Sequence, residues 1–511
     1  MEWFQDGTKL LVSGPVAQEK QGIWVISVIG ATLKKLRDDA HDASLSRDGS
    51  QIVFRDAITQ DVWLMNADGG QARLLFKAEG GYHLLRPTWF PNGKRILYGR
   101  YRSANGEASI MLESRDAKGG DPVPLLSNLR LTDFCWRLDG GRLIYSVREP
   151  APNQYDSNLW ELRFDEESGK PNGTPRRLTD WTGFFFGYPE LTADGKRLVF
   201  LNGRGQSDVY VGELTDGGTE LKTPQRLTLD ERDDWPGGWT LDSKTVFLYS
   251  DRLGTFDIYK QGVGERNAEP VATGPDEKWA PQVSPDGKWV LYMQWPKNLE
   301  GSAIRSGKLM RVPTSGGPAE AVMDITGYPA VTSGDPTNTV GGYPSFRCPF
   351  VGGGTCVLAE AANNQLSFTV VDPLQGRKGE AVKVESDPDL TSWDVSPDGG
   401  RVVLAVFDYK AGDLQVVPLT GGGPQKLSVM PWTELVAVAW AADGKSLFLA
   451  SYSSRGTSIV RTGLTGESKL LFKQPSWDIF SLAPSPDGHL LAFGPVITSA
   501  NAWTIASFPR Q

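Results

Sequence analysis

Histidines, a serine and an acidic run are the residues of this sequence that could carry out chemistry. The three histidines are His41, His83 and His489, and histidine is the usual general base and metal ligand. His489 follows a predicted turn, where we expect it in solvent, whereas His41 and His83 precede predicted strands and could either contact a ligand or have an ordinary structural role. So few histidines disfavour a catalytic metal cluster.

The serine and the acidic run also lack the patterns that catalysis or metal binding requires. The string closest to a G-x-S-x-G nucleophile elbow is GQSDV at 205–209, which lacks the final glycine. The run DERDD at 230–234 does not alternate its carboxylates before a glycine as calcium loops do, which favours a solvated loop. We therefore predict a chain that is not an enzyme and that holds neither a metal nor a cofactor.

A binding surface is the chemistry that remains. Several aromatic and acidic residues precede predicted inner strands, where connecting loops would place them around one mouth of a ring. Aromatic faces beside carboxylates can bind a peptide, a sugar or a cationic ligand, although the same aromatic side chains could instead fill gaps between repeats. The candidate ligand-binding residues are Phe185, Asp233, Asp234, Trp235, Glu277, Trp279, Trp393, Trp432, Trp477 and Asp478.

Composition limits the elements that can position such a site. The 511 residues include 58 Gly and 34 Pro, and 39% are hydrophobic, which is typical of many short strands joined by turns. A net charge of -8 argues against a nucleic-acid partner, because such surfaces need clustered Lys and Arg. No apolar stretch approaches the ~18 residues of a membrane span, so we expect no direct membrane insertion, and the amino terminus has no secretory signal pattern.

One pattern recurs along the chain. It consists of an apolar residue, two variable positions, Asp-Gly, two mostly polar residues and three apolar residues. Its Asp or Asn anchors are Asp6, Asp48, Asn92, Asp139, Asp194, Asp242, Asp286, Asp398, Asp443 and Asp487. Successive anchors lie 42 to 55 residues apart except for one gap of 112, which has room for a degenerate unit around 352–354. A period of about 45 with turn chemistry in each unit indicates propeller blades.

The residues of each unit predict a four-stranded blade. Asp-Gly between apolar runs indicates a hairpin that joins strands one and two. The second strand contains an unbroken apolar triple, such as 52–54, which a strand needs only when both of its faces are buried. We therefore predict an all-β protein, a β-propeller array of about eleven four-stranded blades.

Eleven blades exceed the four to eight that one ring usually holds, so we predict two parts. The last unit lacks an outer strand, and PRRLTDW at 175–181 could supply it. The prediction is an amino-terminal set of about four blades at 1–174, part of an incomplete ring, and a seven-bladed carboxy-terminal propeller at 175–511. We also expect that this chain is the downstream part of a longer protein.

Two of the three cysteines, Cys348 and Cys356, flank the degenerate turn, one on each arm of a hairpin. Cross-strand neighbours come within bridging distance. We predict a disulfide between them, on the condition that the compartment is oxidising.

The repeats resemble those of TolB-like propellers, whose units carry S-P-D-G as residues 284–287, 396–399 and 485–488 do here. More narrowly, DSNLWELRFDEESGKPNGTPRRLT, TADGKRLVF, LMRVPTSGGP and NAWTIASF are similar to the carboxy-terminal propeller region of acidobacterial-type signalling proteins. That resemblance implies an extracytoplasmic sensor behind a serine/threonine kinase or a winged-helix domain, neither of which has its motifs in this chain. The predicted function is binding of an unknown protein, peptide or glycan. The alternative is a propeller that accompanies a prolyl-oligopeptidase-type hydrolase or a carbohydrate-active lyase.

Overall fold

The computed structural model describes most of the chain, and the chain divides into two compact units. Unit 1 contains Met1–Arg204 and Ala500–Gln511, and unit 2 contains Gly205–Leu299 and Ile304–Ser499. The described residues are 1–14, 22–30, 32–79, 82–104, 107–128, 130–150, 156–192, 196–296, 305–327, 344–351, 355–362, 365–387, 391–408, 412–453, 456–475 and 477–505.

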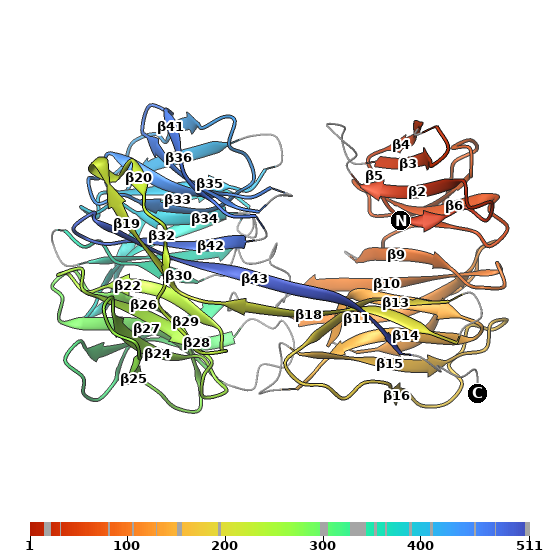
Figure 1. Cartoon of the computed structure of the whole chain (residues 1–511), viewed down its shortest axis with the longest axis horizontal. Helices are drawn as coiled ribbons and strands as arrows, with labels where there is room; N and C mark the ends of the chain where they lie inside the picture. The colour runs from red at the N-terminus through yellow and green to blue at the C-terminus, as the bar shows by residue number, and fades with distance from the viewer. Residues whose placement is uncertain are drawn as a thin grey trace. The chain divides into compact units, whose positions relative to one another are not determined.

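The described residues form antiparallel strands, with one short 3-10 helix, η1 (Asp216–Gly218) (Figure 1). Their sheets are four-stranded apart from one larger sheet, which confirms the predicted all-β propeller architecture. None of the described residues belongs to a helix that is long and apolar enough to cross a membrane.

Unit 1 contains four complete sheets whose strands follow one another in chain order, and one further set of strands. The sheets consist of β1 (Glu2–Trp3), β2 (Lys9–Gly14), β3 (Gly22–Ser27) and β4 (Leu33–Asp38); β5 (Ala40–Leu45), β6 (Gln51–Asp56), β7 (Val62–Asn66) and β8 (Arg73–Phe76); β9 (His83–Trp89), β10 (Arg95–Ala104), β11 (Glu107–Asp116) and β12 (Val123–Ser127); and β13 (Leu131–Asp139), β14 (Arg142–Arg148), β15 (Ser157–Arg163) and β16 (Arg176–Arg177). The further set is β17 (Phe185–Leu191), β18 (Leu198–Ser207) and the end of β43 (Leu490–Ile505).

Unit 2 contains five complete sheets of the same kind. Their strands are β22 (Asp234–Trp239), β23 (Thr245–Ser250), β24 (Asp257–Gly262) and β25 (Glu269–Ala272); β26 (Glu277–Val283), β27 (Trp289–Trp295), β28 (Arg305–Pro313) and β29 (Glu320–Gly327); β30 (Ser345–Arg347), β31 (Cys356–Ala362), β32 (Gln365–Asp372) and β33 (Gly376–Glu385); β34 (Thr391–Val395), β35 (Arg401–Val406), β36 (Asp413–Pro418) and β37 (Gln425–Ser428); and β38 (Leu435–Trp440), β39 (Ser446–Ser451), β40 (Ser458–Gly463) and β41 (Ser468–Lys473).

A sixth sheet of unit 2 joins strands from the two ends of that unit. Strand β42 (Trp477–Pro484) pairs with β43, which pairs with β19 (Tyr210–Thr215), and β19 also pairs with β20 (Glu220–Leu221) and β21 (Gln225–Arg226). The indole Nε1 of Trp239 on β22 donates to the carbonyl of Ala483 on β42 at 2.8 Å. The first and last blades of unit 2 are therefore neighbours, and the ring is closed.

This closure differs from the one expected from the sequence. The segment 175–181 was expected to supply the outer strand of the last blade, but its strand, β16, pairs with β15 and completes a sheet of unit 1. The closing strands are instead β19 and β21, so the described residues of unit 2 form six sheets, not seven. For the same reason the division between the units falls after Arg204, whereas the sequence placed it between 174 and 175.

The recurrent turn owes its stability to hydrogen bonds between its own residues. In the first S-x-D-G turn, the Ser46 hydroxyl donates to Asp48 Oδ1 at 2.6 Å and accepts the amide of Gln51 at 2.9 Å. The same pair of bonds recurs in the turns that contain Ser284, Ser396 and Ser485. Gly49 follows with a φ of 72°, which glycine adopts without strain. These four repeats therefore carry within the turn the hydrogen bonds that stabilise their own hairpin.

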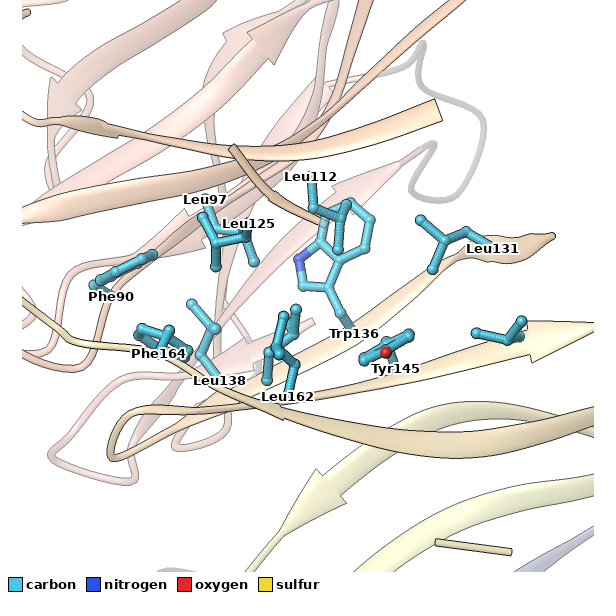
Figure 2. Packing of buried hydrophobic residues seen from close by; sticks show 12 residues of the cluster. Phe90, Leu97, Leu112, Leu125, Leu131, Trp136, Leu138, Tyr145, Leu162 and Phe164 are labelled. Carbon is cyan, nitrogen blue, oxygen red and sulfur yellow. The ribbon is translucent and has the colours of Figure 1, made fainter. Parts of the chain in front are cut away.

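The apolar triples of the second strands are buried on both faces, as predicted. Leu143 and Tyr145 of β14 belong to the core between the β9–β12 and β13–β16 sheets, where Trp136 fills the centre (Figure 2). Ile144, between them, points to the opposite face and packs against Phe186 of β17. The alternation of side chains along a strand thus links three successive sheets.

Cys348 and Cys356 are joined by a disulfide, with their Cα atoms 4.3 Å apart. The bond encloses a short loop, of which 352–354 lie outside the described residues. Replacing both cysteines by serine should lower the free energy of unfolding of unit 2 by about 2–3 kcal/mol, because closing a loop of this length restricts the unfolded chain. Thermal unfolding with and without reductant measures this effect. A wild-type protein that does not respond to reductant would contradict it.

Candidate functional site

The predicted site residues divide between the two units. Phe185 begins β17 in unit 1, so the structure does not group it with the other nine, which lie in unit 2. Those nine stand at, or just before, the beginnings of the first strands β22, β26, β34, β38 and β42. We call this end of unit 2 its loop face. It is formed by the loops that lead into the first strand of each blade and by the loops that join the second strand of each blade to the third.

Two of the tryptophans fill gaps between blades. Trp279 is 4% exposed and Trp393 is 3% exposed. Trp279 packs edge-on against Phe256, at 6.4 Å between ring centroids, and Trp393 packs against Phe368 at 5.0 Å. Both contacts join one blade to the preceding blade. These tryptophans thus have the structural role that the sequence left open as an alternative.

The remaining aromatic residues are only partly buried. Trp477 packs against Tyr210 of the closing strand β19, at 4.6 Å between ring centroids. Trp432 lies against the core between the β34–β37 and β38–β41 sheets. Trp235 stands opposite Tyr249 in the register of β22 and β23. These three rings keep some surface at the loop face.

The acidic candidates differ in role. Glu277 is buried, and its Oε2 accepts the amide of Phe256 at 2.8 Å, so it ties β26 to the preceding blade. Asp478 is half-buried at the beginning of β42, where burial raises the pKa of its carboxyl. Asp233 and Asp234 belong to a larger group, the acidic loop cluster. This cluster comprises the carboxylates Asp208, Asp230, Asp233, Asp234 and Asp251 and the guanidinium groups of Arg226 and Arg252.

Asp233 ties three segments of the cluster together. Its Oδ1 accepts the amide of Ser207, the last residue of β18, at 2.8 Å. Its own amide donates to Asp251 Oδ1, after β23, at 3.0 Å. The Ser207 hydroxyl donates to the carbonyl of Asp234 at 3.2 Å. The chain that leads into the closing strand β19 is thereby fastened to the β22–β25 blade.

The two arginines neutralise part of the cluster. Arg252 Nη2 lies 2.8 Å from Asp234 Oδ1 and 3.0 Å from Asp230 Oδ2. Arg226 Nη2 lies 2.7 Å from Asp208 Oδ1. The Oδ2 atom of Asp234 is fully buried and accepts no hydrogen bond from the described residues. The charge of Arg232 also acts on Asp251, so five carboxylates face three guanidinium groups, which still leaves a surplus of negative charge.

Burial and this surplus shift the titration of the two central carboxyls. Burial and, to a smaller extent, the Asp251 carboxylate raise the pKa of Asp233 to about 7, while the hydrogen bond from the Ser207 amide opposes the shift. Burial also raises the pKa of Asp234 to about 6, against hydrogen bonds from Ser250 and Arg252. Asp233 therefore exchanges its proton close to neutral pH, where a nearby cation would favour the ionised form.

Two leucines beside the cluster are exposed to solvent. Leu229, next to Asp230, is 61% exposed, and Leu253, next to Arg252, is 68% exposed. The ion pair between Asp230 and Arg252 holds the loops that carry them close together. Apolar side chains thus lie beside the negative surplus on the loop face.

A third feature of unit 2 is a cation on its inner strands. Arg347 ends β30, and its guanidinium lies over the ring of Trp393, 5.7 Å from the centroid. Asp394 is nearby, but its Oδ1 is 3.8 Å from Arg347 Nε, and the Asp394 carboxylate accepts the amide of Trp440 at 2.8 Å. Arg347 is therefore only weakly paired.

The other chemical candidates have structural contacts. His83 of β9 lies against Tyr101, 6.3 Å between ring centroids, and burial together with the Arg55 charge lowers the pKa of His41. The described residues contain no group of three or more His, Cys, Asp or Glu side chains arranged to hold a metal ion.

Five residues of these sites were not predicted from the sequence: Asp208, Asp251, Arg226, Arg252 and Arg347. One signal could have found Asp208. An aspartate directly precedes the aliphatic-aromatic step of the third strand at 61–63, 208–210 and 257–259. Arg226 also stands at a recurrent position, since P-x-R-L-T occurs at 175–179 and at 224–228, and Arg177 and Arg226 each lie opposite the aromatic residue of a third strand. Asp251 and Arg252 meet their partners only when separate loops come together.

Comparisons with known proteins show remote similarity. No family model matches the chain. The uncharacterised protein Atu1656 of Agrobacterium fabrum is 25% identical over 253 residues, which are 47% of this chain and 76% of that protein. The chain is a β-propeller protein. That assignment rests on its own sheets and their order.

Several solved propeller structures are also similar to the chain. TolB from Acinetobacter baumannii is 14% identical, with a TM-score of 0.21, over 72% of this chain and 78% of TolB. Oligogalacturonate lyase from Vibrio parahaemolyticus is 11% identical, with a TM-score of 0.31, over 61% and 89% of the two chains. The β-propeller domain of the Trilobed protease from Pyrococcus furiosus is 14% identical, with a TM-score of 0.26, over 62% and 92%.

Proposed function

We propose that unit 2 of this propeller is a non-enzymatic binding module that holds a segment of a protein or peptide ligand at its loop face. The observation that supports this proposal best is the acidic loop cluster beside Leu229 and Leu253. A segment that combines basic and apolar side chains complements this surface in both charge and hydrophobicity.

The negative surplus makes the surface selective for a cation. A Lys or Arg side chain of the ligand, placed near Asp233 and Asp251, would stabilise the ionised carboxylates that the protein itself leaves incompletely neutralised. The two leucines would be buried under the apolar part of the ligand, and burial of exposed leucine side chains contributes about 1.5–3 kcal/mol each. The negative charge of the cluster therefore determines which ligand binds, and burial of the two leucine side chains contributes to the affinity.

We further propose that this binding serves a sensor on the extracytoplasmic side of a larger signalling protein. The sequence resemblance supports that role. The disulfide between Cys348 and Cys356 is consistent with it, because such bonds persist in oxidising compartments.

Selection from a random peptide library displayed on phage, with the full-length protein as target, tests the binding function. We expect enrichment of sequences with Lys or Arg next to Leu, Ile or Phe. Replacing both Leu229 and Leu253 by serine should weaken binding of an enriched peptide at least tenfold, because two buried leucine contacts are lost.

A matched control is Leu241→Ser, since Leu241 is also an exposed leucine but stands in the turn after β22, away from the loop face. That variant should bind as the wild type does. Three results would each contradict a basic protein segment as the ligand. They are equal loss of binding in the control and the double variant, enrichment of sequences that contain no Lys or Arg, and binding only of oligosaccharides in a parallel glycan array.

A further inference from the structure

Most N–H donors of Arg347, an arginine on an inner strand, make no hydrogen bond with the described residues. A guanidinium group has five N–H donors in a planar fork. Arg347 Nη1 donates to the carbonyl of Phe346 at 3.0 Å, and the 3.8 Å separation from Asp394 is too long for a hydrogen bond. Within the part of the chain that the structure describes, Nη2 donates to no acceptor. The side chain is 34% exposed, so its fork is accessible.

The surroundings of Arg347 orient the fork without occupying most of its N–H donors. The ring of Trp393 supports one face of the guanidinium, and Trp393 is itself fixed by a 2.7 Å hydrogen bond from its Nε1 to the hydroxyl of Ser345. Burial raises the pKa of Asp394 to about 6, against the effect of Arg347, so this carboxyl is ionised at neutral pH, but at 3.8 Å it does not occupy the fork with a hydrogen bond.

The charge of Arg347 also acts across the ring. Burial raises the pKa of Tyr249, on β23 of the first blade, and the Arg347 guanidinium opposes that shift. Arg347 belongs to β30, two blades further along the chain. The charge of Arg347 therefore reaches beyond the neighbouring blade.

We propose that Arg347 is an anion subsite of unit 2 and that it binds a carboxylate group of the ligand. A carboxylate matches the planar fork, which can donate two parallel hydrogen bonds to its two oxygens. The subsite deepens the binding function proposed above and rests on it, and it implies a ligand that carries a carboxylate in addition to its basic group. A peptide with an acidic side chain or a free carboxyl terminus has this chemistry.

N-acetyl-leucine and N-acetyl-leucinamide are suitable probes, because they differ only in the carboxylate. Saturation-transfer NMR on the full-length protein should show binding of the acid at least fivefold tighter than binding of the amide. In Arg347→Gln the two probes should bind equally weakly, and Arg347→Lys should restore only part of the preference, because lysine keeps the charge but not the fork.

Arg311→Gln is the matched control. Arg311 also lies over a tryptophan ring, that of Trp289, at 4.6 Å, but its fork already binds Glu320. This variant should retain the preference for the acid. Equal binding of acid and amide to the wild type, or a preference that survives in Arg347→Gln, would overturn the subsite. The peptide selection with the leucine variants tests binding at the loop face independently of Arg347. A failure of the anion subsite can therefore be distinguished from a failure of the proposed binding function.

Discussion

Replacing Lys278 by methionine should lower the free energy of unfolding of unit 2 by about 3–5 kcal/mol. Lys278 Nζ lies 2.7 Å from Asp257 Oδ1, and the two side chains are only 5% and 2% exposed. The ammonium also donates to the carbonyl of Asp276 at 2.8 Å. Methionine preserves much of the volume of lysine but leaves the Asp257 carboxylate buried without its cation. Removing one partner of a buried ion pair therefore costs much more than the pair itself contributes.

Lys308→Met is the matched control for this prediction. Lys308 Nζ also lies 2.7 Å from a carboxylate, that of Asp324, but both side chains are more than half exposed. Its replacement should cost less than about 1 kcal/mol, since water solvates the remaining charge. Urea denaturation gives the two values, and hydrogen exchange measured by mass spectrometry should locate the loss in β24 and β26. Similar costs for the two variants would contradict the argument.

Adding Asp257→Asn to Lys278→Met should recover part of the lost stability. The double variant no longer buries a charge, and the asparagine can still accept the amide of Gly274, which donates to Asp257 Oδ1 at 3.1 Å. A double variant that is less stable than Lys278→Met alone would show that packing, not the unpaired charge, determines the loss.

Asp233→Asn should remove about half of the pH dependence of the stability of unit 2 between pH 5 and pH 8, because Asp234 and Asp394, whose pKa values are raised to about 6, contribute the remainder. The pKa of Asp233 is about 7 in the folded protein, above its ordinary value of 3.8. In this pH range the folded state therefore binds more protons than the unfolded state, and stability falls as the pH rises towards 7. With about 1.4 kcal/mol for each pKa unit, Asp233 alone should account for a loss of about 2–3 kcal/mol over the interval.

The asparagine variant should be more stable than the wild type at pH 8 and similar to it at pH 5. Its side-chain oxygen can still accept the amide of Ser207, and it carries no charge among the other carboxylates. Asp242→Asn is the control, because hydrogen bonds from Thr240 and Lys244 lower the pKa of Asp242 and keep it ionised throughout. Thermal unfolding at several pH values provides the comparison. A wild-type stability that rises with pH would refute the sign of this linkage.

The repeat, its turns and its doubly buried strands could be predicted because they are local. Ser46, Asp48 and Gly49 contain within a few residues the hydrogen bonds and the backbone freedom that form the hairpin. The triple 143–145 likewise shows in its own sequence that both strand faces are covered. Such patterns recur in each unit and therefore reveal the blade.

Ring closure and most of the acidic loop cluster could not be predicted in the same way. Residues 175–181 and 225–226 are both short polar strands, and nothing within either segment shows whether its partner is β15 or β19. Asp251 and Arg252 gain their roles from Asp233 and Asp234, which lie on another loop. Ring closure and the acidic loop cluster both depend on contacts between residues far apart in the sequence, and the local sequence is compatible with other pairings.

The pairing of β19 with β43 has a consequence for the order in which unit 2 can fold during synthesis. Tyr210 leaves the ribosome long before its partner Phe493 exists, so five blades are completed while β19 has one edge without a neighbour. Contacts between such distant residues slow folding, and an unpaired strand edge can associate with other chains. Until β43 has been synthesised, β19 therefore has an open edge with which another chain can pair.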